Sequence, residues 1–305
     1  MSVKLLSLFL MAVFSLVSVA FLTLLERKIL GYLQLRKGPN KVGYVGIFQP
    51  FADALKLFTK EFFSPLNGNF YPYWLSPVFT LIISLIVWLV FPYFFIILSW
   101  KFSFMFMFVI LSLGVYCIMI SGWSSNSNYS MMGCIRVISQ SISYEVSFFL
   151  LIFSLIYLTK SLNILDFCVY QFKIWFIVIM FPVFLMLFVS FLAELNRTPF
   201  DFSEGESELV SGFNIEYGGS GFAFIFLGEY LSILFSSMII CILFFGGVTL
   251  NLLFYFKFMM VSMMIIVIRG TLPRYRYDKL MSLCWKSFLG SSLFLIIFYI
   301  GMLYN

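Results

Sequence analysis

Runs of about 20 consecutive apolar residues recur along the whole length of this 305-residue chain. A helix needs about 20 predominantly apolar residues to cross the hydrocarbon core of a bilayer. Only 10% of the residues are charged, whereas soluble domains carry about 25%, and the mean hydropathy is +1.05. The chain is therefore expected to be an all-α integral membrane protein with one membrane domain, 1–305, rather than two soluble domains.

The lengths of these runs predict eight transmembrane helices, at residues 3–25, 74–98, 102–122, 135–158, 174–193, 222–245, 252–268 and 287–304. The first run begins like a signal peptide. It is long enough to span, however, and Glu26 and Arg27 follow it instead of a small-residue cleavage site. We therefore interpret it as the first membrane helix.

Basic residues are distributed unequally between the two sides that these helices define. Fourteen lie in or beside the loops that follow odd-numbered helices, namely Arg27, Lys28, Arg36, Lys37, Lys41, Lys56, Lys60, Arg136, Arg197, Arg269, Arg274, Arg276, Lys279 and Lys286. The other five are Lys4, Lys101, Lys160, Lys173 and Lys257. Because Lys and Arg concentrate on the inner side, both termini are expected outside, and the long loops 26–73, 194–221 and 269–286 inside.

The first long loop contains a segment with helical periodicity, Phe48–Phe63. Charged and polar residues (Gln49, Asp53, Lys56, Lys60) fall on one stripe, and aromatic or aliphatic residues (Phe51, Leu55, Phe58, Phe62) fall on the opposite one. This pattern is typical of an amphipathic helix that lies in the membrane interface. A helix packed on other protein would show the same pattern, and the two interpretations are compatible.

Acidic residues are scarce, so their placement is informative. Of the 13 acids, six share one inner loop with a single base, Arg197; they are Glu194, Asp201, Glu204, Glu206, Glu208 and Glu216. Crowded carboxylates raise one another's pKa values, and such a group can bind and relay protons. A solvated acidic loop is the plainer alternative, but aromatic residues such as Phe200 and Phe213 interleave with the acids.

Two further acids, Glu145 and Glu229, lie inside predicted membrane helices. An ionised side chain at bilayer depth costs about 2.5–3.5 kcal/mol on insertion scales. We therefore expect both to be functional groups that face the bundle interior, although a structural hydrogen-bonded acid remains the alternative. Polar neighbours of Glu145 on the same helix, among them Arg136 and Gln140, favour a hydrated path.

Metal chemistry is not expected. The chain has no histidine, and its 5 cysteines are scattered without a CxxC spacing. Zinc and iron–sulfur sites in proteins use clustered Cys and His ligands. We expect the cysteines to be buried, apolar and structural.

Four stretches of the sequence carry a family resemblance. They are ERKILGYLQLRKGPNKVGYVGIFQPFADALKLFTKE (26–61), RVISQSISYEVS (136–147), AELNRTPFDFSEGESELVSGFNIEYGG (193–219) and RGTLPRYRYDKLMSLCWK (269–286). They resemble, in order, the signature loops of the subunit 1 family of NADH:ubiquinone oxidoreductase (respiratory complex I). The phenylalanine-rich composition, with 42 Phe, is similar to that of its mitochondrially encoded members.

The resemblance implies an eight-helix membrane subunit whose inner loops form the membrane-side part of the quinone-binding tunnel. It implies quinone-binding roles for Arg27, Arg36, Phe226 and Arg276. It also implies a proton path of carboxylates, made of Glu145, Glu194, Asp201, Glu204, Glu206, Glu208 and Glu229. Glu26, Asp53 and Glu216 would belong to a secondary polar region.

The same resemblance implies a proton-pumping enzyme complex in the mitochondrial inner membrane, in which this chain is not catalytic alone. The chain would bind no cofactor, ubiquinone would be the substrate, and FMN and iron–sulfur clusters would belong to partner subunits. The expected partners are the hydrophilic-arm subunits, neighbouring membrane subunits and lipids, with no nucleic acid.

Three other functions fit parts of the sequence. A proton-coupling subunit of a related membrane-bound hydrogenase would share the acidic loop but bind no quinone. A stand-alone transporter would often show internal repeats, and the two halves of this chain show none. A pure scaffold would not require Glu145 and Glu229 at membrane depth.

Overall fold

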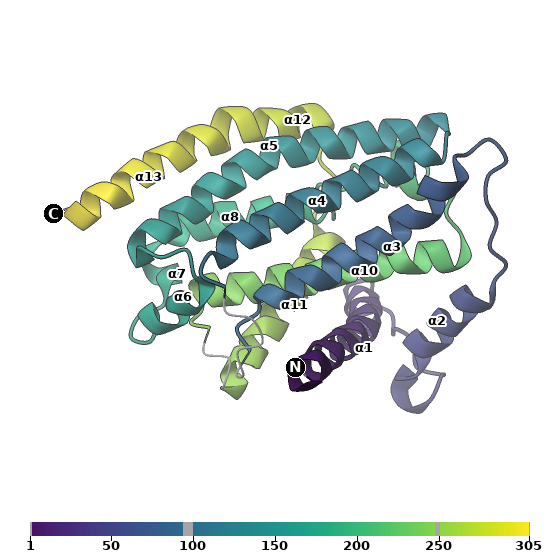
Figure 1. Ribbon diagram of the computed structural model, residues 1–305, viewed down its shortest axis with the longest axis horizontal. Helices are drawn as coiled ribbons and strands as arrows, with labels where there is room; N and C mark the ends of the chain where they lie inside the picture. The colour runs from purple at the N-terminus through teal and green to yellow at the C-terminus, as the bar shows by residue number, and fades with distance from the viewer. Residues whose placement is uncertain (1, 94–99, 248–250, 305) are drawn as a thin grey trace.

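The computed structural model describes residues 2–93, 100–247 and 251–304, and every regular element in these ranges is helical (Figure 1). Among the described residues, seven helices are long and apolar enough to cross a membrane. They are α1 (Ser2–Leu33), α3 (Phe70–Val87, extended by the 3-10 turn η2, Trp88–Val90), α4 (Ser103–Ser124), α5 (Asn128–Thr159), α10 (Gly219–Phe244), α11 (Leu252–Thr271) and the continuous α12 (Tyr277–Ser282), η4 (Leu283–Phe288) and α13 (Leu289–Tyr304). The all-helical class predicted from the sequence is confirmed.

Shorter elements connect these helices. They are η1 (Tyr44–Gly46), α2 (Gln49–Thr59), α6 (Ile164–Tyr170), α7 (Phe176–Ile179), α8 (Phe181–Glu194), α9 (Glu206–Leu209) and η3 (Gly212–Asn214). Helix α2 falls within the segment that the sequence predicts to be amphipathic, and its apolar Phe51, Leu55 and Phe58 are exposed. In Figure 1, α2 lies to one side of the bundle, next to α1.

The fifth predicted helix, 174–193, is broken in the structure. Met180, at φ −118° and ψ 40°, separates α7 from α8. A proline follows in the first turn of α8, where its missing N–H leaves no helical hydrogen bond unmade. The 14 residues of α8 reach only about 21 Å, which is short for a hydrocarbon core of about 30 Å.

Helix boundaries differ from the predicted ones mainly at the polar ends. Helix α1 continues to Leu33, α5 begins at Asn128, and the last helix begins at Tyr277. Apolar run length misses these turns because polar residues such as Glu26, Asn128 and Asp278 interrupt the apolar runs without ending the helices. The inner loop predicted at 269–286 is correspondingly short. The end of the second predicted helix, from residue 94 to 98, lies outside the described residues.

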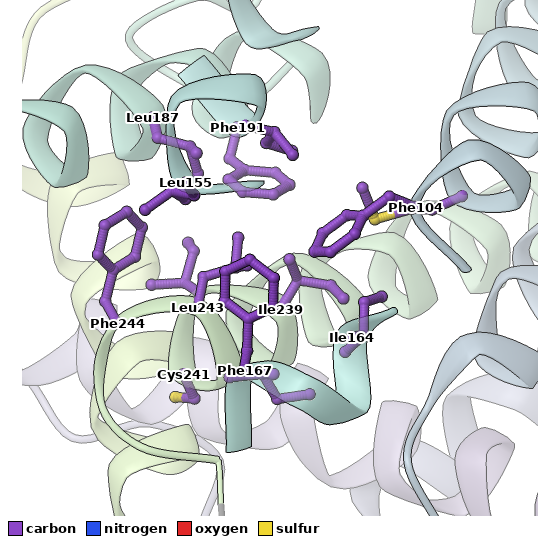
Figure 2. Packing of buried hydrophobic residues seen from close by; sticks show 14 of the residues in the cluster. Phe104, Leu155, Ile164, Phe167, Leu187, Phe191, Ile239, Cys241, Leu243 and Phe244 are labelled. Atoms are coloured by element: carbon purple, nitrogen blue, oxygen red, sulfur yellow. The ribbon is translucent and has the colours of Figure 1, made fainter. Parts of the chain in front are cut away.

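Helix α10 is the centre of the bundle and packs against α1, α2, α3, α6 and α11. From Ile233 to Phe244 every residue of α10 is buried. This stretch packs with α4, α5, α6 and α8 in a largely apolar core, part of which Figure 2 shows around Leu155, Leu187 and Phe191. On the outer helices, by contrast, residues such as Phe14 and Ile297 are exposed. They fit a surface solvated by lipid.

The polar loops meet at one end of the bundle, which we call the polar end. There the backbone N–H of Tyr275 donates to Pro199 O at 2.9 Å, and the N–H of Asn69 donates to Ser124 O at 2.9 Å. Gly212, at φ +54°, allows the acidic loop to fold back on itself, because a Cβ at that position would lie 1.7 Å from Ser203 O. Only glycine fits so close an approach.

Candidate functional site

A buried ionic cluster joins three helices near the polar end. Glu26 of α1 is 5% exposed. It is paired with Arg269 of α11, and it accepts a hydrogen bond of 2.5 Å from the hydroxyl of Tyr230 on α10. A buried carboxylate is tolerated only when it is paired and hydrogen-bonded. Glu26, expected only as part of a secondary polar region, therefore lies at the centre of this cluster.

Arg197 extends the cluster towards Glu229. Its guanidinium Cζ lies 4.7 Å from the centroid of the Tyr230 ring, and its Nη2 lies 3.7 Å from Oε2 of Glu229. Burial lowers the pKa of Arg197, but the facing carboxylate of Glu229 and other acidic neighbours raise it by more. Arg197 therefore stays charged and holds Glu229 by electrostatics rather than by a short hydrogen bond.

A cavity of about 160 Å³ continues from Glu229 to Glu194. Helices α3, α4, α5, α8 and α10 surround it, and hydroxyls of Ser141, Ser232 and Ser236 are among its polar wall groups. A cavity holds water when it is roomy and offers several polar partners. This one meets both conditions and can connect the two carboxylates by hydrogen-bonded water.

A second cavity, of about 30 Å³, adjoins the first. Ser141 and Glu194 line both, and Glu145 lines the second. The three carboxylates Glu229, Glu194 and Glu145 thus lie in order along two adjoining spaces. Glu145 was expected to face the bundle interior. Its side chain does line this cavity, but the residue is also exposed at the flank of α5.

The other acids of the inner loop lie in different surroundings. Asp201 is buried, pairs with Arg274 at 3.0 Å, and accepts the backbone N–H of Glu204 at 3.2 Å. Glu204 itself is half-buried and contributes to the field at Arg197. The loop is therefore not a purely solvated one, as the interleaved aromatic residues indicated.

Two acids of this loop lie away from the cavities, and one cannot be placed. Glu208 is exposed and pairs with Arg136 at 2.5 Å. Glu216 is half-buried, and its backbone carbonyl accepts the Tyr73 hydroxyl at 2.6 Å. The side chain of Glu206 lies outside the described residues. Neither Glu208 nor Glu216 borders the two cavities between Glu229 and Glu145.

Gln140 fixes the turn that carries Glu194 and Arg197. It is fully buried on α5, and its Nε2 donates to Ala193 O at 2.8 Å and to Phe200 O at 3.0 Å. The sequence marked Gln140 only as part of a hydrated path. Its burial depends on tertiary packing, and a buried amide must find hydrogen-bond partners.

The residues expected at a quinone site fall into two groups. Phe226 belongs to an aromatic ladder on α10, with ring centroids 4.8 Å from Phe222 and 5.3 Å from Tyr230. Arg27 pairs with Asp53 at 2.5 Å and so ties the end of α1 to α2. These two residues therefore lie on helices that meet, since α2 contacts both α1 and α10.

Arg36 and Arg276 are exposed and lie in different loops. The Nε of Arg36 donates to Gln34 Oε1 at 3.0 Å, and Arg276 is 3.5 Å from Asp278. The turn after Arg36 is tightly built, because Gly46 at φ +81° lies where a Cβ would be 2.2 Å from Pro39 O. Within this chain, then, the structure does not bring Arg36 and Arg276 to Phe226.

Fold and site together define a class: a multi-span membrane protein with a buried ionic cluster and three carboxylates that line adjoining cavities. The model of the NADH dehydrogenase family matches residues 6–300, and the chain belongs to this family. It is 56% identical over 286 residues to "NADH-ubiquinone oxidoreductase chain 1" of Aedes aegypti, covering 94% of this chain and 91% of that protein.

Other relatives carry the same name. The protein of Locusta migratoria is 55% identical over 287 residues, covering 94% of this chain and 91% of its own length. That of Apis mellifera ligustica is 47% identical over 300 residues, covering 98% of this chain and 96% of its own length. The similarity therefore covers nearly the whole of this chain and nearly the whole of each relative.

Proposed function

We propose that this chain is a membrane subunit of a mitochondrial NADH–ubiquinone oxidoreductase that couples quinone reduction to proton translocation. It would line the membrane-side part of the quinone tunnel and carry protons along its carboxylates. The observation that carries the proposal is the series Glu229, Glu194 and Glu145 along two adjoining cavities, which starts beside the buried Glu26 cluster. The names of the relatives supply the enzyme and its quinone substrate.

The quinone would enter where α1, α2 and α10 meet. Long apolar ligands bind in largely hydrophobic slots that offer few polar groups. Phe222, Phe226 and Tyr230 present such a surface along α10, and α2 packs on another face of the same helix, where the rings of Phe58 and Phe224 lie 5.9 Å apart. Arg27 stands at this portal, and Arg36 and Arg276 would reach the tunnel in the assembled complex.

The coupling step follows from the position of Tyr230, which contacts both the aromatic ladder and the ionic cluster. Its ring is the last of the aromatic ladder, and its hydroxyl donates a hydrogen bond to Glu26. The guanidinium of Arg197 lies over the face of the same ring. Negative charge that develops on a quinone beside the ladder would attract Arg197 away from Glu229. Glu229, less well neutralised, would then take up a proton and pass it through water in the cavities to Glu194 and Glu145.

Asp201, Glu204, Glu206 and Glu208 would bring protons to this series from the polar end, with Asp53 and Glu216 in the surrounding polar region. In the membrane, α7 and α8 would together make a broken fifth helix and so complete eight spans. Both termini would then face the intermembrane space, and α2 would lie at the matrix-side interface.

The chain would not act alone. Electrons must come from FMN and iron–sulfur clusters in hydrophilic-arm subunits docked on the polar end. Glu145, exposed on the flank of α5, would be covered by a neighbouring membrane subunit, because a lipid-facing carboxylate is costly at bilayer depth.

The test is Glu194→Gln in the assembled complex, reconstituted in vesicles. We expect the number of protons pumped per NADH oxidised to fall at least tenfold, while NADH oxidation by a hydrophilic acceptor is unchanged. Glu61→Gln, at an exposed acid after α2 that borders neither cavity, is the matched control and should pump normally. Normal pumping by Glu194→Gln would contradict the proposal.

A further inference from the structure

Asn196 lies between two residues of the candidate site, Glu194 and Arg197. It follows the last turn of α8 and adopts the left-handed backbone conformation, at φ +50°, and its N–H donates to Ala193 O at 3.2 Å. Glycine is the residue that most often fills such a helix end, and asparagine is the usual substitute. The backbone would therefore accept glycine here, so its conformation does not account for the amide side chain.

The side-chain amide of Asn196 is free to bind water. The residue is half-buried and belongs to the wall of the larger cavity. Within the described part of the chain, neither Nδ2 nor Oδ1 makes a hydrogen bond, and neither is sealed away from water. An asparagine amide carries two donors on its nitrogen and an acceptor on its oxygen, so it can bind two waters in opposite orientations.

The wall of this cavity reaches the acidic loop beside Asn196. Most wall residues belong to membrane helices, but Asn196, Ser203 and Phe213 come from the loop that follows α8. Glu204 is next to Ser203 in the sequence and acts electrostatically on Arg197. The part of the cavity beside Asn196 is therefore where a proton from the acidic loop would enter.

The other neutral polar side chains of the wall have no donor left for water. All are hydroxyls, and each donates its only proton within the protein. Five donate to a carbonyl of their own helix at 2.6–2.9 Å, and Ser203 donates to Asp201 Oδ1 at 3.4 Å. The hydroxyl residues are Thr80, Ser84, Ser141, Ser203, Ser232 and Ser236. Of the neutral side chains that the structure describes in this wall, only Asn196 therefore keeps a donor for water.

We infer that Asn196 is a positioning residue of the proton path, which holds cavity water in order between the acidic loop and Glu194. The inference rests on the proposed function, because it concerns the same path. Water that accepts from Nδ2 turns its own hydrogens away from the amide, towards Glu194 or the next water. A second water donates to Oδ1 and leaves its oxygen open to a proton from the loop. The amide itself neither gains nor loses a proton.

The first variant is Asn196→Gly in the assembled complex, reconstituted in vesicles. Glycine keeps the left-handed conformation without strain, and loss of the side chain leaves room for water but no donor to orient it. We expect the number of protons pumped per NADH oxidised to fall about two- to tenfold, as for the loss of one hydrogen bond. NADH oxidation by a hydrophilic acceptor should be unchanged.

The matched control is Asn126→Gly. Asn126 also has φ +50°, in the exposed turn between α4 and α5, and it borders neither cavity. Its Nδ2 donates to Asn67 O at 3.0 Å, so the control also removes a hydrogen bond. The same substitution at the same backbone conformation should leave pumping normal.

Asn196→Asp separates the orientation of water from the support of the helix end. Aspartate has nearly the same size and also tolerates the left-handed conformation, so a structural role would leave pumping normal at every pH. An ionised carboxylate has no donor, whereas a protonated carboxyl group has an O–H. Relative to the wild type at each pH, we therefore expect Asn196→Asp to pump poorly at alkaline pH and to recover as the pH falls.

A normal ratio in assembled Asn196→Gly complex would overturn the positioning role. A pH-independent ratio in Asn196→Asp relative to the wild type, whether normal or low, would overturn it as well. If Asn196→Gly fails to assemble, the pH profile of Asn196→Asp still decides. The proposed function stays intact after such a result provided that Glu194→Gln loses pumping, and it fails too if Glu194→Gln pumps normally.

Discussion

The two halves of α10 differ in composition and in packing. From Gly219 to Tyr230 the helix carries an acid, an aromatic ladder and glycines, and it borders cavities. From Ile233 to Phe244 every residue is buried, and most pack in the apolar core seen in Figure 2 at Ile239, Leu243 and Phe244, although Ser236 still borders the larger cavity. One continuous helix is thus packed tightly through its second half and carries the acid of the proposed proton path in its first half.

This difference explains how buried charge is tolerated near the polar end. Lipid tails are as apolar as leucine, so membrane helices gain association energy mainly from packing and interhelical hydrogen bonds. The second half of α10 supplies the packing. The first half can therefore leave space for water beside Glu229. Substitutions in the second half should disturb assembly, and substitutions in the first half should disturb coupling.

The largest effect is expected for Leu243→Asp, in the apolar half. Leu243 is fully buried, so the change removes packing worth about 2–5 kcal/mol and inserts a carboxylate that costs about 2.5–3.5 kcal/mol. We expect no assembled complex on native gels. Leu243→Met, which nearly conserves volume, should assemble. Normal assembly of Leu243→Asp would remove the distinction between the two halves.

The next largest effect is expected for Arg269→Leu, at the ionic cluster. Glu26 would lose its ion-pair partner while still buried, and breaking a buried pair costs about 3–5 kcal/mol. We expect a lower melting temperature of the complex by differential scanning fluorimetry. The double variant Arg269→Leu with Glu26→Gln should recover most of the loss, because no buried charge is then unpaired. Failure of this recovery would show that the pair does not act as a unit.

A smaller effect is expected for Gln140→Leu, which removes the two hydrogen bonds that hold the turn around Glu194. Each carbonyl keeps a backbone donor, Asn196 N–H at Ala193 O and Phe202 N–H at Phe200 O, so the loss is about 0.5–1.5 kcal/mol for each hydrogen bond. The complex should assemble, but proton pumping per NADH oxidised should fall about twofold as Glu194 becomes less well positioned. Gln140→Glu keeps an acceptor but not the donors, and it should not restore pumping. Unchanged pumping in Gln140→Leu would show that the turn is held by other contacts.

The sequence predicted the helical class and placed Glu145 and Glu229 within long apolar helices, α5 and α10. It could not predict the Glu26 cluster, because Arg269 and Tyr230 are 243 and 204 residues away along the chain, and only tertiary packing brings them together. The break at Met180 also has no signature in apolar run length. Pro182 was the local cue, since proline favours a helix start.

Residues of the same charge in the predicted site lie in different environments. Asp201 and Glu208 belong to one acidic loop, yet the first is buried against Arg274 and the second is exposed beside Arg136. Arg27 and Arg276 were both expected at the quinone, yet only Arg27 lies beside α2. Residue type and spacing indicate which residues are candidates for the site. Burial distinguishes these candidates from one another, and it depends on contacts between residues far apart in sequence.

The most direct test of the account is to block the space between the carboxylates without removing any of them. Gly114 of α4 lines the larger cavity, and a Cβ built on it meets no atom within 4 Å. Gly114→Leu should therefore fill the cavity and exclude water. Gly301→Leu, where a Cβ also meets no atom within 4 Å, is the matched control far from the cavity.

The measurement is the number of protons pumped per NADH oxidised by the reconstituted complex. The account predicts that Gly114→Leu lowers this ratio at least tenfold while NADH oxidation by a hydrophilic acceptor is unchanged, and that Gly301→Leu pumps normally. A normal ratio in assembled Gly114→Leu complex would show that protons do not pass between Glu229 and Glu194 through this cavity.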